Sequence, residues 1–493
     1  MRSKDKGECG VLLHISSLPS KYGIGTLGLE AYKFIDFLCE AGQGYWQILP
    51  IVPIGEGNSP YKSSSCFAGE ILFIDLEFLV RDGLLKADEL PEESFSERVD
   101  YKKLKNEKIP LLKKAAERFD KDNKDYKAFL EENSLWLQNY ALFSCIADEY
   151  GELLSRFPEE LRYRLPHALE GFRLSHRNEM DFYCITQYLF YKQYFELKKY
   201  AVKMGVQLIG DIPFYISLES ADVWENPDAF KLGRDLTPMK VAGVPPDRFS
   251  ETGQLWGNPV YDWDYHKKTN YSWWKKRLKF CSKLYDVLRI DHFRAFASYY
   301  SIPYGAPDAR NGVWEHGPGI SFWKSVEHSC GNLMIIAEDL GGEEPDVEQL
   351  VEKCGFPNMK VVQFCFDGDI KNRFLPKNYN RNCVCYTGTH DNETALGWYH
   401  EAPLKQKVYF DGITPKKEGV PALRMIDFAM RSRAALVVIP MQDWLCLDNK
   451  ARMNTPGIKG NNWEWKMAQD TDYKALTERM RRICMGREKG LNQ

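Results

Sequence analysis

Val287-Leu-Arg-Ile-Asp-His-Phe-Arg294, Leu333-Met-Ile-Ile-Ala-Glu-Asp-Leu340 and Val384-Cys-Tyr-Thr-Gly-Thr-His-Asp-Asn392 are three short stretches with one feature in common. Each is an apolar run of β-type residues that ends near a carboxylate, namely Asp291, Glu338 or Asp391. Runs that are apolar throughout are typical of parallel strands buried on both faces. The carboxyl ends of parallel strands lie at the same edge of a sheet, so we expect the three acids to lie close together there. We call this edge the mouth.

Five further runs of the same kind bring the number of predicted strands to eight. Charged stretches of helical period separate most of them, which is typical of β/α units. The eight predicted strands are Val11–Ile15, Tyr45–Ile51, Gln207–Ile212, Val287–Ile290, Leu333–Ala337, Lys360–Phe364, Cys383–Tyr386 and Ala435–Met441. This count predicts an α/β protein, a (β/α)8 TIM barrel with helical insertions.

Two gaps between the predicted strands are too long for a single crossover helix. We therefore predict that residues 1–80 and 176–493 form the barrel, and that residues 81–175 are a helical subdomain inserted after strand 2. Residues 213–286 are a long insertion after strand 3, and its Gly- and Pro-rich part, 241–260, is predicted to be an active-site loop. The residues after the eighth run suffice for a final helix but not for a C-terminal β-sandwich domain.

Composition excludes several classes of function. The 66 Lys and Arg residues and 69 Asp and Glu residues give a formal net charge of −3. The sequence therefore has no excess of positive charge that would favour binding to nucleic acid or to an anionic membrane, and we expect a neutral substrate. The 13 cysteines form no C-x-x-C pair, and the polar start has no signal-peptide pattern. We expect reduced thiols and a cytoplasmic enzyme.

Paired carboxylates at one mouth are the groups that cleave a glycosidic bond. Arg289 lies two residues before Asp291, so on a strand both side chains point the same way, and the guanidinium favours an ionised nucleophile. Glu338 then serves as the acid, which requires a raised pKa. Asp391 is expected to stabilise positive charge at the anomeric carbon.

Simpler interpretations compete with this one. A single acid at a strand end is more often a helix N-cap or an ion-pair partner than a catalyst, and His390 alone is more often a structural hydrogen-bonding residue. Gly23-Ile-Gly-Thr-Leu-Gly28 matches a dinucleotide fingerprint, but it does not follow its strand directly and strand 2 does not end in a ribose-binding acid. A metal-dependent barrel hydrolase is the strongest competitor, with candidate ligands His14, Asp211, His292 and His390.

Further motifs along the chain carry a family resemblance. They are Leu13-His-Ile-Ser-Ser-Leu-Pro-Ser-Lys-Tyr-Gly-Ile-Gly, Ser59-Pro-Tyr, Gly210-Asp-Ile-Pro, Pro245-Pro-Asp-Arg-Phe, Leu255-Trp-Gly-Asn-Pro, Arg289-Ile-Asp-His-Phe-Arg, Ala337-Glu-Asp-Leu-Gly, Thr389-His-Asp-Asn and Arg452-Met-Asn-Thr-Pro-Gly. In this order they resemble the 4-α-glucanotransferases, or amylomaltases, of the α-amylase clan. One departure is Asn461-Asn462 before Trp463, where the family more usually has Gly-Asn-Trp.

The resemblance implies that Asp291 is the nucleophile, Glu338 the acid/base and Asp391 the transition-state stabiliser. It also implies that Tyr61, Asp211, Arg289 and His390 line the subsite of the cleaved glucose, and that Phe249 and Trp256 contact the acceptor. The expected partners are maltooligosaccharides and other α-1,4-glucans, with no metal and no cofactor. A hydrolytic α-amylase and a noncatalytic glucan-binding protein remain the alternatives.

Overall fold

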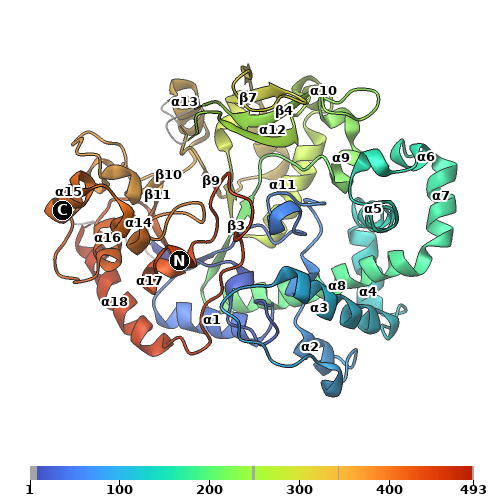
Figure 1. The fold of residues 1–493 in the computed structure, drawn as a ribbon, viewed down its shortest axis with the longest axis horizontal. Coiled ribbons are helices and arrows are strands. Elements are labelled where there is room, and N and C mark those ends of the chain that lie inside the picture. The colour runs from blue at the N-terminus through green and yellow to red at the C-terminus, as the bar shows by residue number, and fades with distance from the viewer. Residues whose placement is uncertain (1–7, 247–249, 342–343, 491–493) are drawn as a thin grey trace.

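The computed structural model describes residues 8–246, 250–341 and 344–490, and its centre is a closed barrel of eight parallel strands (Figure 1). Around the barrel the order is β1-β12-β11-β10-β9-β6-β3-β2. The barrel strands are β1 Glu8–Leu12, β2 Tyr45–Gln47, β3 Gln207–Ile212, β6 Val287–Ile290, β9 Ile335–Ala337, β10 Asn358–Val361, β11 Cys383–Tyr386 and β12 Leu436–Pro440. The predicted (β/α)8 barrel is confirmed.

Two predicted strands are displaced in the structure. The first strand begins at Glu8 and ends at Leu12, and Ile15–Ser17 is a 3-10 turn. The sixth strand ends at Val361, and the apolar Val362–Cys365 that follows is also a 3-10 turn. Both turns are largely buried. The apolar residues of these turns are buried under neighbouring elements. Hydrophobic periodicity alone cannot distinguish a short buried turn of this kind from a buried strand.

Helices surround the barrel. They are α1 Leu29–Glu40, α2 Leu76–Arg81, α3 Tyr101–Glu117, α4 Lys124–Glu132, α5 Leu137–Tyr150, α6 Glu159–Arg162, α7 Pro166–Ser175, α8 Arg177–Lys203, α9 Ala221–Glu225, α10 Trp263–Lys268, α11 Ser272–Leu284, α12 Gly319–Cys330, α13 Pro345–Cys354, α14 Ala395–Glu401, α15 Leu404–Ile413, α16 Pro421–Met430, α17 Met441–Trp444 and α18 Tyr473–Gly490. None of the helices in the described part of the chain combines the length and apolar character needed to cross a membrane.

The long helix α8 joins the added helices α3 to α7 to the barrel. It packs against α1, α3, α4 and α5, and it leads directly into β3. Gly205, with φ of 75°, ends it by adopting the left-handed conformation that favours glycine. Buried side chains of α3 and α5 belong to the same apolar core as those of the barrel. The inserted helices therefore extend the barrel's core.

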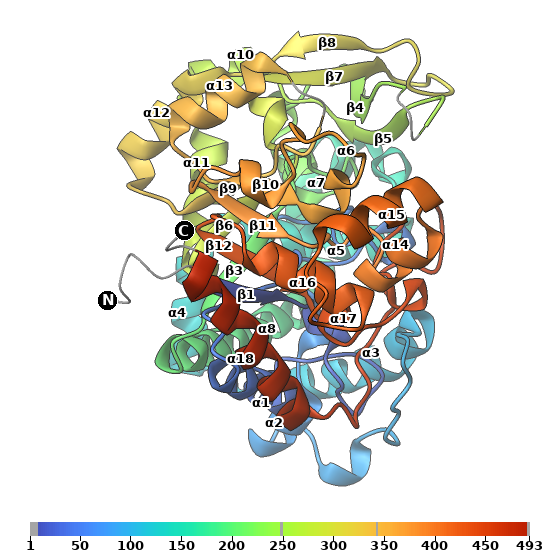
Figure 2. The ribbon, with the colours of Figure 1, turned by 90° about the vertical axis from the view of Figure 1, so that its left-hand side faces the viewer.

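Residues 241–260, predicted as a loop, contain two strands in the structure. β4 Lys240–Val244 pairs antiparallel with β5 Gln254–Pro259 and with β7 Ser298–Pro303, and β8 Val313–His316 completes the sheet. Figure 2 shows this four-stranded sheet at one edge of the molecule, next to α12 and α13. Its strands come from two separate connections, after β3 and after β6, so no local periodicity marks the sheet.

Close packing explains the glycines of the Gly23–Gly28 motif. Gly23 has φ of 81°, in the left-handed region. A Cβ on Gly25 would lie 1.8 Å from the carbonyl oxygen of Ile15, and one on Gly28 would lie 1.9 Å from a carboxylate oxygen of Asp75. The motif therefore packs the turn after β1 tightly against its neighbours.

Candidate active site

The barrel register brings two of the three predicted acids together. Ile290 of β6 pairs with Ala337 of β9, and Asp291 and Glu338 are the residues that follow on these neighbouring strands. The amide of Glu338 donates to the carbonyl of Ile290 at 3.1 Å. Asp391 follows β11 at the same end of the barrel. The three acids thus share the mouth formed by the strands' carboxyl ends.

A buried ion pair fixes the wall beside Asp291. Nη1 of Arg289 lies 2.6 and 2.7 Å from the two carboxylate oxygens of Asp211 and 3.1 Å from Oδ1 of Asp291. The side chains of Arg289 and Asp211 are 4% and 0% exposed. The hydroxyl of Tyr61 donates to Asp211 at 2.7 Å. One guanidinium therefore serves two carboxylates, and Asp211 receives its shorter bonds.

Burial raises the pKa of Asp291 well above its ordinary value. Arg289 opposes that shift, whereas the charges of Asp211, Glu338 and Asp391 add to it. The sequence predicted that Arg289 would keep this carboxylate ionised. The guanidinium does act in that direction, but its pairing with Asp211 leaves it only partly available to Asp291.

Backbone amides hold both oxygens of Glu338. Oε2 accepts from the amide of His292 at 2.7 Å, and Oε1 accepts from the amide of Leu340 at 2.9 Å. His292 has φ of 47°, a left-handed conformation that is uncommon for a residue other than glycine. This turn directly after Asp291 aims the amide at Glu338, and so links the positions of the two acids. No sequence pattern had indicated it.

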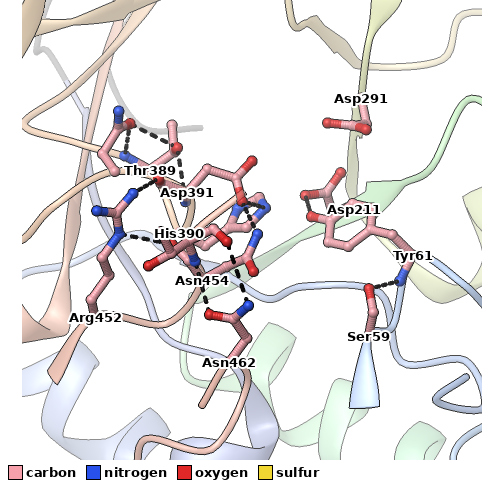
Figure 3. Close-up of polar contacts among 12 residues, drawn as sticks. Ser59, Tyr61, Asp211, Asp291, Thr389, His390, Asp391, Arg452, Asn454 and Asn462 are labelled. Carbon is pink, nitrogen blue, oxygen red and sulfur yellow. Dashed lines mark hydrogen bonds and ion pairs between the residues drawn. The ribbon is translucent and has the colours of Figure 1, made fainter. Parts of the chain in front are cut away.

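Asp391 is held by a segment that follows β12. Nδ2 of Asn454 donates to Oδ1 of Asp391 at 2.6 Å, and Nη2 of Arg452 donates to its carbonyl oxygen at 2.6 Å. The amide of Asn454 also donates to the carbonyl of His390 at 3.0 Å. Figure 3 shows these residues on one side of the site, with Asp211, Asp291 and Tyr61 on the other. Sequence reasoning assigned no role to Asn454 or Arg452, although both lie in the motif Arg452-Met-Asn-Thr-Pro-Gly.

Aromatic rings connect the two sides. The ring of Tyr61 stacks on that of His390, with centroids 5.3 Å apart and planes at 13°. Trp463 contacts both rings, at 5.6 and 5.8 Å. The tail position of Trp463 is fixed in turn by Asn462, whose Oδ1 accepts from the amide of Thr455 at 2.9 Å. Asn462 therefore shapes the tail turn that places an aromatic ring behind His390.

Trp256 and Phe249 are the two residues predicted to contact the acceptor. Trp256, on β5, packs its ring edge-on against His292, with centroids 4.8 Å apart. Phe249 lies outside the described residues. Trp256 therefore contacts the residue next to Asp291, and its role at the acceptor stays a prediction.

The metal-ligand candidates are dispersed around the mouth. Burial lowers the pKa of His14 and of His292 to about 3 each, which keeps both rings neutral. Among the residues that the structure describes, no group of three or more His, Cys, Asp or Glu side chains has the arrangement to hold a metal ion. Asp339, next to Glu338, is buried and accepts from the amide of Met359 at 3.1 Å, so it points away from the mouth.

Comparison with known proteins gives consistent matches over nearly the whole chain. A family model described as 4-alpha-glucanotransferase matches residues 13–471. A 4-alpha-glucanotransferase of Clostridium butyricum is 42% identical over 481 residues, covering 96% of this chain and 98% of that protein. One from Thermus thermophilus is 42% identical over 473 residues, covering 93% and 94%.

A solved structure matches equally well. An amylomaltase from Streptococcus agalactiae, in complex with acarbose, has a TM-score of 0.94 and 38% sequence identity to this chain. The match covers 97% of this chain and 98% of that one. The similarity therefore includes the inserted helices and the tail as well as the barrel.

Proposed function

Because this chain belongs to the 4-alpha-glucanotransferase family, we propose that it moves a segment of an α-1,4-glucan to an acceptor sugar by a retaining, two-step displacement. The observation that carries the proposal is the meeting of Asp291 and Glu338 on neighbouring strands, with Asp391 at the same mouth. Two carboxylates of unlike environment beside one anomeric carbon are what such a mechanism requires.

In the first step Asp291 attacks the anomeric carbon and Glu338 donates a proton to the departing glycosidic oxygen. The bond to the leaving sugar breaks as a β-glucosyl ester forms on Asp291, and the reducing-end fragment leaves with a free 4-hydroxyl. The attack requires Asp291 to be ionised, and Arg289 is the cation that favours this form. Bound sugar displaces water and completes the surroundings of the acids.

In the second step a new sugar enters and its 4-hydroxyl loses a proton to Glu338. The oxygen attacks the ester carbon, the bond to Asp291 breaks, and the second inversion restores the α configuration. The ring positive charge that develops in both steps lies close to Asp391. Asn454 supports that role because it bonds the carboxylate of Asp391, and Arg452 supports it because it bonds the backbone carbonyl of the same residue.

The subsite of the cleaved glucose is proposed to consist of Tyr61, Asp211, Arg289 and His390. Arg289 and Tyr61 both bond Asp211 and hold its carboxylate in place. Nε2 of His390 lies 3.4 Å from Oδ1 of Asp391. Trp256, beside His292, is proposed to contact the acceptor. Phe249 keeps the same predicted role. The acarbose complex of the Streptococcus agalactiae amylomaltase supports maltooligosaccharides as the substrate class.

Incubation with maltotriose followed by sizing of the products tests the activity. Transfer predicts glucose together with a ladder of longer maltodextrins and no net gain of reducing ends. A hydrolytic α-amylase would instead release reducing ends steadily, and a glucan-binding protein would leave maltotriose unchanged. Activity that persists after exhaustive chelation supports a metal-free mechanism, whereas loss with EDTA and recovery with zinc contradicts it.

The nucleophile has its own test. Asp291→Asn is expected to lower maltotriose disproportionation by several orders of magnitude while the circular dichroism spectrum stays unchanged. Asp470→Asn, at an exposed position, is the matched control and is expected to retain full activity. Near-normal turnover of the Asp291 variant contradicts the assignment.

A further inference from the structure

The loop that carries His390 and Asp391 covers residues 388–394, between β11 and α14. The segment after β12 bonds the middle of this loop, at Asp391. A loop that is held only at its middle can still tilt, and a tilt moves His390 and Asp391 together. The residues that bond the two ends of the loop therefore matter for the geometry of the site.

One buried carboxylate bonds both ends of the loop. Oδ2 of Asp443 accepts from the hydroxyl of Thr387 at 2.5 Å, and Oδ1 accepts from the amide of Ala395 at 2.7 Å. Asp443 lies on α17, directly after β12, and is 1% exposed. Thr387 and Ala395 are fully buried. The carboxylate therefore joins the residue before the loop to the residue after it, in a place shielded from solvent.

Both donors need this acceptor. Ala395 is the first residue of α14, so its amide has no acceptor within the helix. A buried hydroxyl such as that of Thr387 is likewise unfavourable when it is left without a partner. Loss of the carboxylate would leave two buried groups unsatisfied, and the loop would have to move for them to find other partners.

A cavity borders the loop on the side of β1. Residues 389, 390 and 392–394 of the loop line it, and so do His14, which lies just after β1, and Asp443. Empty space beside a loop provides no packing contacts that would oppose a shift in that direction. Polar contacts must hold the loop there instead, and Asp443 supplies them at both ends.

Gln363 bonds the same loop from the opposite side. It follows β10, and β11 lies between β10 and β12 in the barrel. Its amide donates to the carbonyl of Thr387 at 3.2 Å, and its Nε2 donates to the carbonyl of Glu393 at 2.8 Å. The loop is therefore held from both neighbouring strands, with Asp443 as the support on the β12 side.

We propose that Asp443 is a positioning residue for glucan transfer, which ties Thr387 to Ala395 and thereby holds His390 and Asp391 in place. This inference rests on the proposed function of His390 and Asp391, and it adds a residue that acts through the loop. Asp443 acts by the geometry of its two bonds. An amide in its place forms both of them, because its oxygen accepts from Ala395 and its NH2 donates to the hydroxyl of Thr387.

The two bonds do not require a charge on Asp443. Burial raises the pKa of Asp443 to about 6. The ionised carboxylate accepts both bonds. When Oδ2 carries a proton, that proton donates to the hydroxyl oxygen of Thr387 and Oδ1 still accepts from Ala395. The connection between the loop ends therefore persists in both protonation states, which separates a positioning role from a role in proton transfer.

Hydrogen exchange measured by mass spectrometry tests the bridge without any use of activity. In Asp443→Ala the amides of residues 388–395 are expected to exchange about tenfold faster than in the wild type, whereas Asp443→Asn keeps the wild-type rates. Asp75→Ala is the matched control, because Asp75 is also buried and also accepts from a hydroxyl, of Thr26 at 2.7 Å, and an amide, of Phe78 at 3.0 Å. It is expected to leave exchange at 388–395 unchanged. Unchanged exchange in folded Asp443→Ala overturns the proposal.

Initial rates of maltotriose disproportionation test the consequence for the reaction. We expect kcat of Asp443→Ala to fall roughly 10- to 100-fold, since small misplacements of reacting groups cost of this order. Asp443→Asn is expected to retain most of kcat and the pH–rate profile of the wild type. Asp75→Ala keeps kcat although it unfolds at a lower temperature. Equal kcat in Asp443→Ala and Asp75→Ala overturns the proposal, and so does an Asp443→Asn variant as slow as the alanine variant.

A milder change tests one bond alone and needs no loss of the carboxylate. Thr387→Val keeps the shape of the side chain but removes the donor, so we expect a several-fold fall of kcat, whereas Thr387→Ser retains it. The double variant Thr387→Val/Asp443→Ala is expected to be no slower than Asp443→Ala, because both changes act through the same bond. Losses that multiply in the double variant contradict the bridge.

The two kinds of measurement separate this inference from the proposed function. If the wild type leaves maltotriose unchanged, the transfer mechanism is wrong, and hydrogen exchange still supports or refutes the bridge between the loop ends. If exchange rises in Asp443→Ala while kcat does not fall, the positioning role is wrong and the transfer mechanism stands.

Discussion

Asn454 donates its side-chain amide to Oδ1 of Asp391 across 2.6 Å, from a segment 63 residues further along the chain. Its own backbone amide is bonded to the carbonyl of His390, so it contacts residues 390 and 391 at two points. Arg452 adds a third bond, to the carbonyl of Asp391. The position of Asp391 after β11 places its carboxylate at the mouth, and the segment after β12 fixes the orientation of that carboxylate.

Removal of that amide is expected to affect the chemical step. Asn454→Ala leaves Asp391 with its charge but without its orienting donor, so we expect kcat of maltotriose disproportionation to fall roughly 10- to 100-fold, since misplacement of a reacting group by about 1 Å costs of this order. KM is expected to change little. Initial-rate kinetics over a range of maltotriose concentrations measure both.

Asn382→Ala is the matched control, because Asn382 is exposed and its amide bonds a single carbonyl, that of Gly355. Asn454→Asp gives a second readout. It places two carboxylates in contact, so the loss of kcat is expected to be larger than for alanine and to be partly relieved at lower pH. Equal kcat in Asn454→Ala and Asn382→Ala would show that the bond does not position Asp391.

Stability should depend on Asp291 with a definite sign. Its pKa is raised in the folded protein, so the native state holds the proton more tightly than the unfolded chain. Its contribution is favourable at low pH and is lost as pH rises from the ordinary value near 4 through the raised one. Asp291→Asn cannot ionise, so we expect it to unfold at a higher temperature than the wild type at pH 7.

Calorimetry across pH measures that difference. It is expected to shrink towards pH 4, and at neutral pH to amount to about 1.4 kcal/mol for each unit by which folding raises the pKa. Asp470→Asn, at an exposed position, is expected to unfold like the wild type at every pH. A destabilised Asp291→Asn at pH 7 would contradict the inferred direction.

The strand-end acids could be predicted from the sequence, whereas their supports could not. Asp291, Glu338 and Asp391 each follow an apolar run whose period and length are local properties. The support of Asp391 is Asn454, which lies in an irregular segment where no period exists. The left-handed turn at His292 likewise leaves no mark, because residues other than glycine seldom adopt it.

The four-stranded sheet β5-β4-β7-β8 was not predicted for the same physical reason. β4 and β5 lie in a stretch rich in Gly and Pro, and β4 pairs with β7, which comes from the connection after β6. Strand pairing between distant segments is decided by tertiary contacts that a local pattern does not contain. The barrel strands were recognisable because both of their faces are buried, and that requires an apolar residue at almost every position.

Arg289 should set the acid limb of the pH–rate profile. Its guanidinium is the cation that lowers the pKa of Asp291, so Arg289→Gln is expected to raise that pKa further and move the acid limb of kcat/KM to higher pH. The same change leaves Asp211 buried without its partner, and stability is expected to fall by about 3–5 kcal/mol. Rates measured from pH 4 to 8, at a temperature below unfolding, test the first effect.

The double variant Asp211→Asn/Arg289→Gln separates the two effects. It removes the uncompensated buried charge, so most of the lost stability should return, yet the acid limb should stay displaced because Asp291 still has no cation beside it. Tyr61→Phe is the control for a lost contact to Asp211 that leaves Arg289 in place. An unmoved acid limb in Arg289→Gln would show that Arg289 does not govern the ionisation of Asp291.

Trp256 is expected to decide between sugar and water in the second step. Its ring packs edge-on against His292, next to Asp291, and its Nε1 donates to Oε1 of Gln254 at 3.1 Å on the same strand. A large apolar surface there is expected to favour an acceptor ring and to exclude water from the proposed glucosyl ester. Trp256→Ala opens that space, so we expect the ratio of hydrolysis to transfer to rise several-fold. Reducing-end release and glucose formation from maltotriose, measured in one reaction, give this ratio. Trp256→Phe is the control, because it keeps an aromatic ring and should retain most of the preference for transfer. An unchanged ratio in Trp256→Ala would show that Trp256 does not exclude water.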